Sequence, residues 1–206
     1  ETSYAVFWNE TDCISVNGIA SESISIQEDR RSAEFTFLKG FESALYAAYP
    51  ASVVSKYESG ALTLLLPNVQ TWSESDQFDP AAAVMLAQAA DGASLRFRHA
   101  MAYLRVTLSE ASDPEPIAAV VLSANDGSAL CGAFQATYGS DLWTLTPQES
   151  AASQVELRCG TQGAPLGSQM VIAIPAGEYA AGLTVQVKDV SGDYQVRKSV
   201  NAFTAT

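Results

Sequence analysis

The chain has 206 residues, with 11 lysines and arginines against 23 aspartates and glutamates, so its formal net charge at pH 7 is −12. A surface with that balance repels phosphate groups, so nucleic acid is not an expected partner. Hydrophobic residues make up 48% of the chain, which excludes a disordered acidic tail and indicates a folded protein.

Strand patterns dominate the first half of the chain. Short segments in which apolar and polar residues alternate recur between turn residues, as in half-buried strands, and Pro50 and Pro67 each end one of them. The predicted strands of this half span residues 4–8, 13–16, 21–26, 34–37, 44–49 and 61–66. One helix is predicted over residues 80–90, because Asp79 can cap it and Pro80 suits its first position.

The single histidine, His99, lies in a strand pattern over residues 95–108. Leu95 and His99 share one face at a period of two, whereas Leu104 falls in the opposite phase. The pattern therefore predicts a bulge or break between residues 100 and 103. The strand pattern also predicts a core or hydrogen-bonded histidine that does not transfer protons.

Two prolines and several acidic residues interrupt the alternation at about residues 111–116, which predicts a linker. Strand patterns resume beyond it, and residues 125–127 have turn chemistry. The predicted strands of this half span residues 117–122, 130–138, 143–145, 155–157, 170–174, 183–187 and 194–196, the last two as a hairpin. Because strands recur without strand–helix alternation, we expect an all-β fold of two tandem β-sandwich domains, residues 1–110 and 117–206.

No constellation of catalytic residues is recognisable. A serine–histidine–acid triad would depend on His99, and the chain has neither a G-x-S-x-G elbow nor a phosphate-binding glycine loop. The acidic residues lie mostly in polar turns, which disfavours a glycosidase pair. A calcium site at Glu74, Asp76 and Asp79 lacks the glycine and the ligand spacing of a calcium loop. We therefore expect no enzyme, no metal site and no cofactor.

Cys13, Cys131 and Cys159 form no metal-binding motif. Three buried thiols are favoured, and a disulfide between Cys131 and Cys159 is the alternative. No apolar run approaches the roughly 20 residues of a membrane-spanning helix. The start at Glu1, without Met, leads us to expect an exported chain whose signal has been removed.

The three tryptophans differ in their sequence context. Trp8 and Trp143 lie in apolar strand patterns typical of the core, whereas Trp72 lies in a polar loop. Trp72 is therefore the candidate for stacking on a ligand such as a sugar, although packing is the favoured interpretation.

A series of short motifs runs through the chain in a fixed order. An aromatic pair precedes D-C-I-S-V, then come F-T-F-L-K-G, the strand L-Y-A-A-Y-P, the turn L-P-N-V-Q and the strand L-x-F-x-H, at residues 7–16, 35–40, 45–50, 66–70 and 95–99. Their order and spacing resemble the fimbrillin family of Bacteroidales, which are subunits of type V pili and related surface proteins. The resemblance covers essentially the whole chain, although the second-half motifs are looser and the three cysteines depart from the pattern.

The resemblance implies two transthyretin-like domains in a structural or adhesive subunit of cell-surface fimbriae. It implies an exported, lipid-anchored precursor at the outer membrane, with the acylated cysteine upstream of Glu1. Subunits would assemble by β-strand addition, so the implied partners are other fimbrial subunits and host or bacterial surface receptors or glycans. Val200, Ala202 and Thr204 are candidate donor-strand residues, although an ordinary closing strand is favoured. The alternative function is a surface glycan-binding lipoprotein module that uses Trp72.

Overall fold

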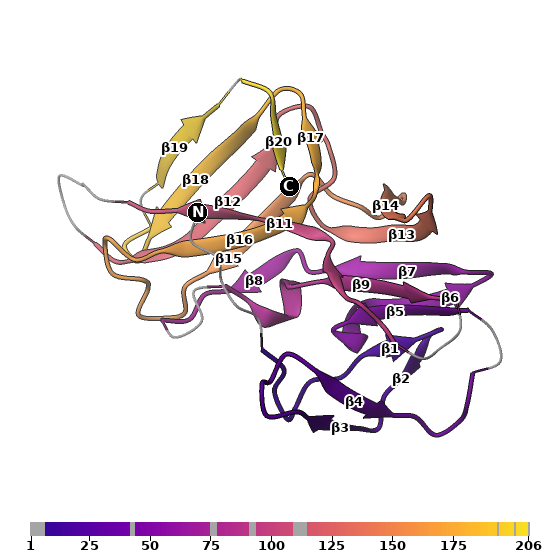
Figure 1. The fold of residues 1–206 in the computed structure, drawn as a ribbon. Helices are drawn as coiled ribbons and strands as arrows, with labels where there is room; N and C mark the ends of the chain where they lie inside the picture. Colours follow the sequence, from indigo (N-terminus) through magenta and orange to yellow (C-terminus); the bar gives the residue numbers. More distant parts are fainter. Residues whose placement is uncertain are drawn as a thin grey trace.

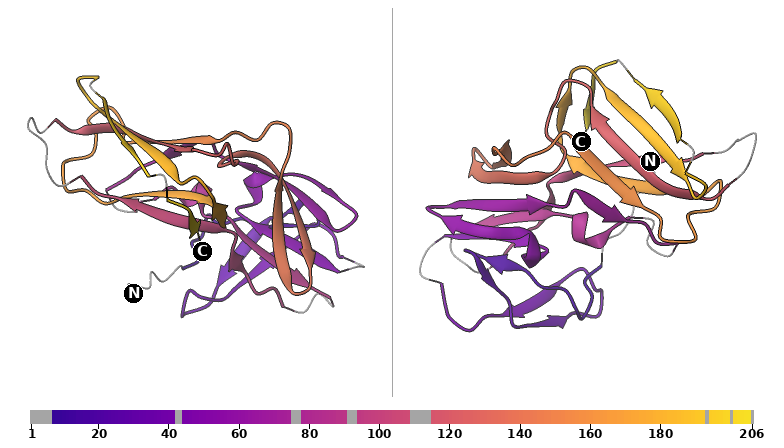
Figure 2. Two further views of the ribbon diagram at one scale, coloured as in Figure 1. Left: turned by 90° about the horizontal axis from the view of Figure 1, so that it is seen from above. Right: turned by 180° about the vertical axis from the view of Figure 1, so that it is seen from behind.

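The computed structural model of the chain describes residues 7–41, 44–74, 78–90, 94–108, 115–192, 194–199 and 201–205. Within these residues nearly all regular structure is strand, which confirms the all-β prediction. The strands stack as successive layers, with the β3–β4 hairpin at one end and the sheet that contains β12 and β18 at the other (Figure 1). The view from behind shows the same order of layers (Figure 2).

One sheet has five strands in the order β10–β9–β5–β1–β2. Its strands are β1 (Ser15–Val16), β2 (Ile19–Ala20), β5 (Leu45–Tyr49), β9 (Met85–Ala89) and β10 (Arg98–His99). One face packs against the aromatic residues of the N-terminal segment and of the hairpin formed by β3 (Ser23–Ile26) and β4 (Ala33–Thr36). Trp8 lies at the centre of this outer cluster, in edge contact with Phe35, Tyr49 and Phe97. The predicted strand at residues 4–8 lies partly outside the described residues, and Phe7 and Trp8 are not in a strand.

The opposite face of this sheet packs on a four-stranded sheet in the order β14–β13–β7–β6. The strands of the second sheet are β6 (Val54–Glu58), β7 (Ala61–Leu66), β13 (Gly132–Gly139) and β14 (Leu142–Pro147), and the 3-10 turn η1 (Ala51–Val53) precedes β6. Leu62, Leu64 and Phe134 meet Ala48 and Leu86 between the two sheets, all of them buried. Ala47 and Ala87, next to Ala48 and Leu86 along their strands, are buried in the outer cluster, so β5 and β9 are covered on both faces.

A second sandwich lies beyond the four-stranded sheet. Its larger sheet has the order β19–β18–β12–β15–β8, made of β8 (Val69–Thr71), β12 (Ile117–Ala124), β15 (Gln154–Arg158), β18 (Leu183–Asp189) and β19 (Tyr194–Lys198). It packs on two strand pairs, β11 (Met101–Val106) with β16 (Met170–Pro175), and β17 (Gly177–Tyr179) with β20 (Phe203–Ala205). Leu122, Leu157 and Ile172 are fully buried between them. The predicted hairpin is confirmed, because β18 and β19 pair over five residues.

Strands from the two halves of the sequence are hydrogen-bonded to each other. β7 pairs with β13, β8 pairs in parallel with β15, and β11 pairs with β16. Residues 111–114 of the predicted linker lie outside the described residues. A division of the chain at that linker would nevertheless break all three ladders, so the sheets are shared between the predicted domains 1–110 and 117–206.

The helix predicted over residues 80–90 is wrong. Asp79 does cap this segment, since its Oδ1 accepts a hydrogen bond from the Ala81 N–H at 2.9 Å, but only the 3-10 turn η2 (Pro80–Ala82) follows. The chain then enters β9, which lies between β5 and β10. The helix propensity of the alanines is outweighed because their small side chains fit between two packed layers.

The predicted break after His99 is confirmed and has a topological cause. β10 pairs with β9 and ends at His99, whereas β11 begins at Met101 and pairs with β16. Between them, the Ala100 N–H donates to the Val84 carbonyl at 2.9 Å. The phase of the pattern slips here because the chain leaves one sheet and joins another.

Candidate functional site

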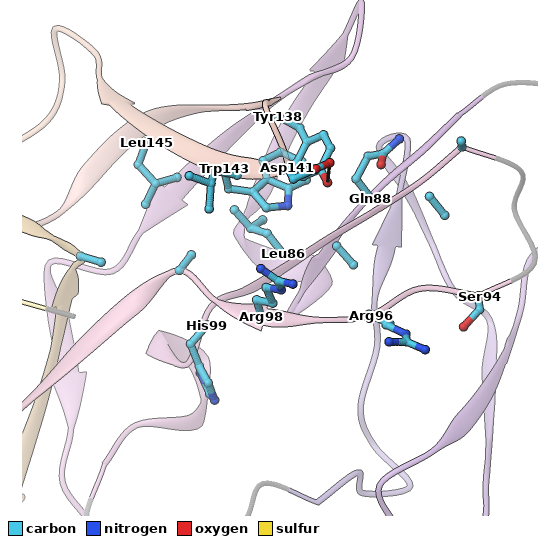
Figure 3. A pocket seen from close by; sticks show the side chains of 16 residues that line it. Leu86, Gln88, Ser94, Arg96, Arg98, His99, Tyr138, Asp141, Trp143 and Leu145 are labelled. Atoms are coloured by element: carbon cyan, nitrogen blue, oxygen red, sulfur yellow. Dashed lines mark hydrogen bonds between the residues drawn. The ribbon is translucent and has the colours of Figure 1, made fainter.

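Two edge strands leave one side of the first sandwich open. β10 is the last strand of the five-stranded sheet and β14 is the last strand of the four-stranded sheet, and they are not paired with each other. A cavity of about 560 Å3 lies between them (Figure 3). Ala100, between β10 and β11, and Ala176, between β16 and β17, also line it.

The β14 side of the cavity is an aromatic wall. Trp143 lies with its ring centroid 5.4 Å from that of Tyr138 and 6.3 Å from that of Tyr46, so neighbouring rings fix its orientation. The Tyr138 hydroxyl donates to Asp141 Oδ1 at 3.3 Å, which places a carboxylate at the rim. The sequence predicts Trp143 in the core; the structure shows it half-buried, with part of the ring facing the cavity.

The opposite side of the cavity carries positive charge. Leu95 and Phe97 pack into the outer aromatic cluster, so the alternating residues Arg96 and Arg98 line the cavity instead. Arg98 is the register partner of Leu86 in β9. In Figure 3 both arginines come from the segment across from Trp143, with Ser94 farther along the same segment. The sequence signal for this arrangement is the L-R-F-R alternation at residues 95–98, which puts the two arginines on the same face.

His99 lies between this cavity and a smaller one of about 290 Å3. A core position for His99 is wrong, because β10 is an edge strand and the residue is exposed, whereas the alternative of a hydrogen-bonded histidine is confirmed. Its Nδ1 does have a hydrogen-bond partner, the Tyr103 hydroxyl at 3.1 Å, and the two rings meet edge to face. Partial burial by such neighbours lowers the pKa of His99 below 6.5.

Three aromatic residues of the outer cluster line the smaller cavity, Trp8, Tyr49 and Phe97. The carboxylate of Asp12 also borders it. The Tyr49 hydroxyl donates to Asp12 Oδ1 at 2.9 Å. Burial and the neighbouring carboxylate raise the pKa of Tyr49 well above its usual value, so the hydroxyl keeps its proton and this hydrogen bond at physiological pH.

Trp72, the sequence candidate for ligand stacking, is half-buried against the core of the second sandwich. Its Nε1 donates to the Gln169 carbonyl at 3.0 Å. The ring is therefore held by packing and by a backbone hydrogen bond, and it lies outside both cavities described above.

The C-terminal strand carries the candidate donor residues. Val200 lies outside the described residues, and Ala202 and Thr204 are exposed. The inward residues of β20 are Phe203, which stacks on Tyr179 with ring centroids 5.3 Å apart, and the buried Ala205. β20 pairs with β17 of its own chain through three residue pairs.

The remaining sequence candidates have structural roles or lie outside the described residues. Cys13, Cys131 and Cys159 are free thiols, and the last two are buried. Both oxygens of the Asp79 carboxylate accept backbone hydrogen bonds, whereas Asp76 lies outside the described residues. Within the described ranges there is no cluster of metal-ligating side chains, and no helix there is long and apolar enough to cross a membrane.

Comparison with known proteins shows a likeness of fold. No protein-family model matches the sequence, and no curated protein matches it. A candidate cell adhesion protein from Bacteroides uniformis has a similar structure, with a TM-score of 0.56 at 14% identity, over 98% of this chain and 85% of the other. A candidate cell adhesion protein from Bacteroides ovatus gives a TM-score of 0.52 at 13% identity, over 96% of this chain and 80% of the other.

Proposed function

We propose that this chain is a structural or adhesive subunit of cell-surface fimbriae, exported to the outer membrane as a lipid-anchored precursor. The candidate cell adhesion proteins of Bacteroides that share its fold support the adhesion role, and the motif resemblance to fimbrillins supports the fimbrial one. In this proposal the chain has no catalytic activity, and its partners are other fimbrial subunits and receptors on host or bacterial surfaces.

Subunits assemble by exchange of the C-terminal strand. The observation that carries this step is the short β17–β20 ladder, which holds the last strand through three residue pairs. Exchange of an identical element between copies re-forms the same contacts in trans and so costs little free energy. Phe203 and Ala205 would fill the acceptor, because they point inward, whereas Ala202 and Thr204 would face solvent.

The exchanged segment has a defined starting point. Asn125 Nδ2 donates to the carbonyl of Ser199 at 2.6 Å and to that of Ala181 at 2.8 Å. A Cβ at Gly182 would lie 2.4 Å from the same Ser199 oxygen, so the two segments are in close contact. These contacts hold the chain in place at Ser199. We therefore expect β20, which follows, to be the strand that is exchanged between subunits.

A mixture of two variants, each with one introduced cysteine, tests strand exchange directly. Glu178 and Thr204 are register partners, exposed on neighbouring strands, and opposite residues of an antiparallel pair are close enough for a disulfide. One chain would carry Glu178→Cys and the other Thr204→Cys, both with Cys13→Ser to remove the half-buried native thiol. Oxidation of the mixture is expected to give a covalent heterodimer.

The matched control uses the β3–β4 hairpin, where Ser23 and Thr36 are exposed register partners. A mixture of Ser23→Cys and Thr36→Cys chains should give no heterodimer. Strand exchange is refuted if Glu178→Cys and Thr204→Cys form a disulfide readily when placed in one chain but never between chains.

A further inference from the structure

From the chemistry of the cavity between β10 and β14, we propose that it binds a carboxylate-bearing saccharide. This goes beyond the assembly role proposed above. The cavity contains no residue of β17 or β20, so a chain with its C-terminal strand in place can bind the ligand, whether or not strands are exchanged.

The size and the lining of the cavity suit a short oligosaccharide. Its volume of about 560 Å3 lies within the roughly 300–1,000 Å3 typical of small-ligand sites. Trp143 offers part of an aromatic face, on which the apolar face of a sugar ring can stack. The cavity is also lined by polar side chains that can form hydrogen bonds with sugar hydroxyl groups, those of Gln88, Ser94 and Asp141.

The positive charge of two arginines in the cavity favours an acidic ligand. Arg96 and Arg98 supply two of the chain's 11 positive residues to one cavity of a protein with net charge −12. Within the described part of the chain, neither arginine has an ion-pair partner. A guanidinium binds a carboxylate through two parallel hydrogen bonds, so this pair of side chains is suited to a uronic or similar sugar acid.

The polar lining favours a saccharide over an added peptide strand. A strand laid along β14 would need apolar pockets for its alternate side chains. Arg96, Arg98 and Gln88 instead line much of the facing wall, and the Asp141 carboxylate lies at the rim of the β14 side. β10 offers only two residues as the facing edge. An acidic peptide is therefore the competing ligand to be excluded by experiment.

Calorimetric titration of the full chain tests the proposal with three defined probes, trigalacturonic acid, the neutral trisaccharide maltotriose and a hexaglutamate peptide. Trigalacturonic acid should bind more tightly than either of the others, and its affinity should fall as salt is added. Arg96→Gln with Arg98→Gln should weaken that binding at least about tenfold, because each removes a charge-assisted contact. Trp143→Phe should weaken it without removing the preference for the acid.

The control variant carries Arg197→Gln and Lys198→Gln on the edge strand β19, which removes the same charge from a different sheet. Its affinity for trigalacturonic acid should match that of the unchanged chain. The proposal is overturned if the unchanged chain does not bind trigalacturonic acid at millimolar concentration, if maltotriose or hexaglutamate binds as tightly, or if the β19 control loses as much affinity as the cavity variant.

Discussion

His99 ends an edge strand, where its ring meets Tyr103 while much of the side chain stays exposed. The folded-state pKa of His99 lies below 6.5, and burial is the cause. The folded chain therefore binds fewer protons than the unfolded chain as the pH falls past 6.5. The stability that neutral His99 contributes is complete above pH 6.5 and is lost as the pH falls below that value.

The His99 prediction can be tested by an NMR titration, since one histidine gives one imidazole signal. We expect a midpoint below pH 6.5 in the folded chain. Tyr103→Phe keeps the ring that buries the imidazole, so its midpoint should stay low, whereas Tyr103→Ala should move the midpoint toward 6.5. A midpoint at or above 6.5 in the unchanged chain would contradict the burial argument.

At the scale of single residues, the local sequence pattern predicts where the alternation of side chains along a strand changes phase. It is a poorer guide to whether a given side chain is exposed. The alternation through Leu95 and His99 correctly predicts the break at Ala100. It does not predict that His99 is exposed or that Trp143 borders a cavity, because both depend on which strands become sheet edges. That outcome is set by strand pairing between segments far apart in the sequence.

At the scale of the elements, Gln70 completes the hydrogen bonding of β16. This buried side chain bonds both backbone groups of Ala173, donating from Nε2 to the carbonyl at 2.7 Å and accepting the N–H at Oε1 at 2.9 Å. It acts as a short substitute for a neighbouring strand. The glutamine of the L-P-N-V-Q motif therefore has a structural role in this chain.

Loss of the Gln70 side-chain amide should destabilise the folded chain. Gln70→Met keeps the length of the side chain but leaves two buried backbone groups unpaired, which should lower the free energy of unfolding by about 3 kcal/mol. Urea denaturation measures this change. Gln135→Ala on the exposed side of β13 should change it by less than about 0.5 kcal/mol. Equal stability of Gln70→Met and the unchanged chain would refute the assigned role.

The sequence pattern predicts the positions of most strands, but it does not predict which strands pair with each other. The alternation at residues 61–66 and 130–138 predicts two strands, yet nothing local indicates that β7 and β13 pair across the predicted linker. The helix predicted over residues 80–90 is wrong for a related reason. Its alanines favour a helix in isolation, and only the position between β5 and β10 explains the strand.

At the scale of the whole molecule, the shared ladders predict one cooperative unit. Residues 1–110 expressed alone would lack β13, β15 and β16, which pair with β7, β8 and β11. This fragment should show no cooperative thermal transition. The full chain should unfold in one step by circular dichroism and by tryptophan fluorescence. A cooperative transition of the isolated 1–110 fragment would show that the sequence-based domain division holds in solution.

The central claim, that this chain is a subunit of surface fimbriae, is tested most directly by electron microscopy of intact cells that produce it, labelled with a gold-conjugated antibody against the chain. We predict that gold lies along thin filaments that project from the cell surface, and that deletion of the gene removes both the label and the filaments. Gold confined to the cell interior, or unchanged filaments in the deletion strain, would contradict the claim.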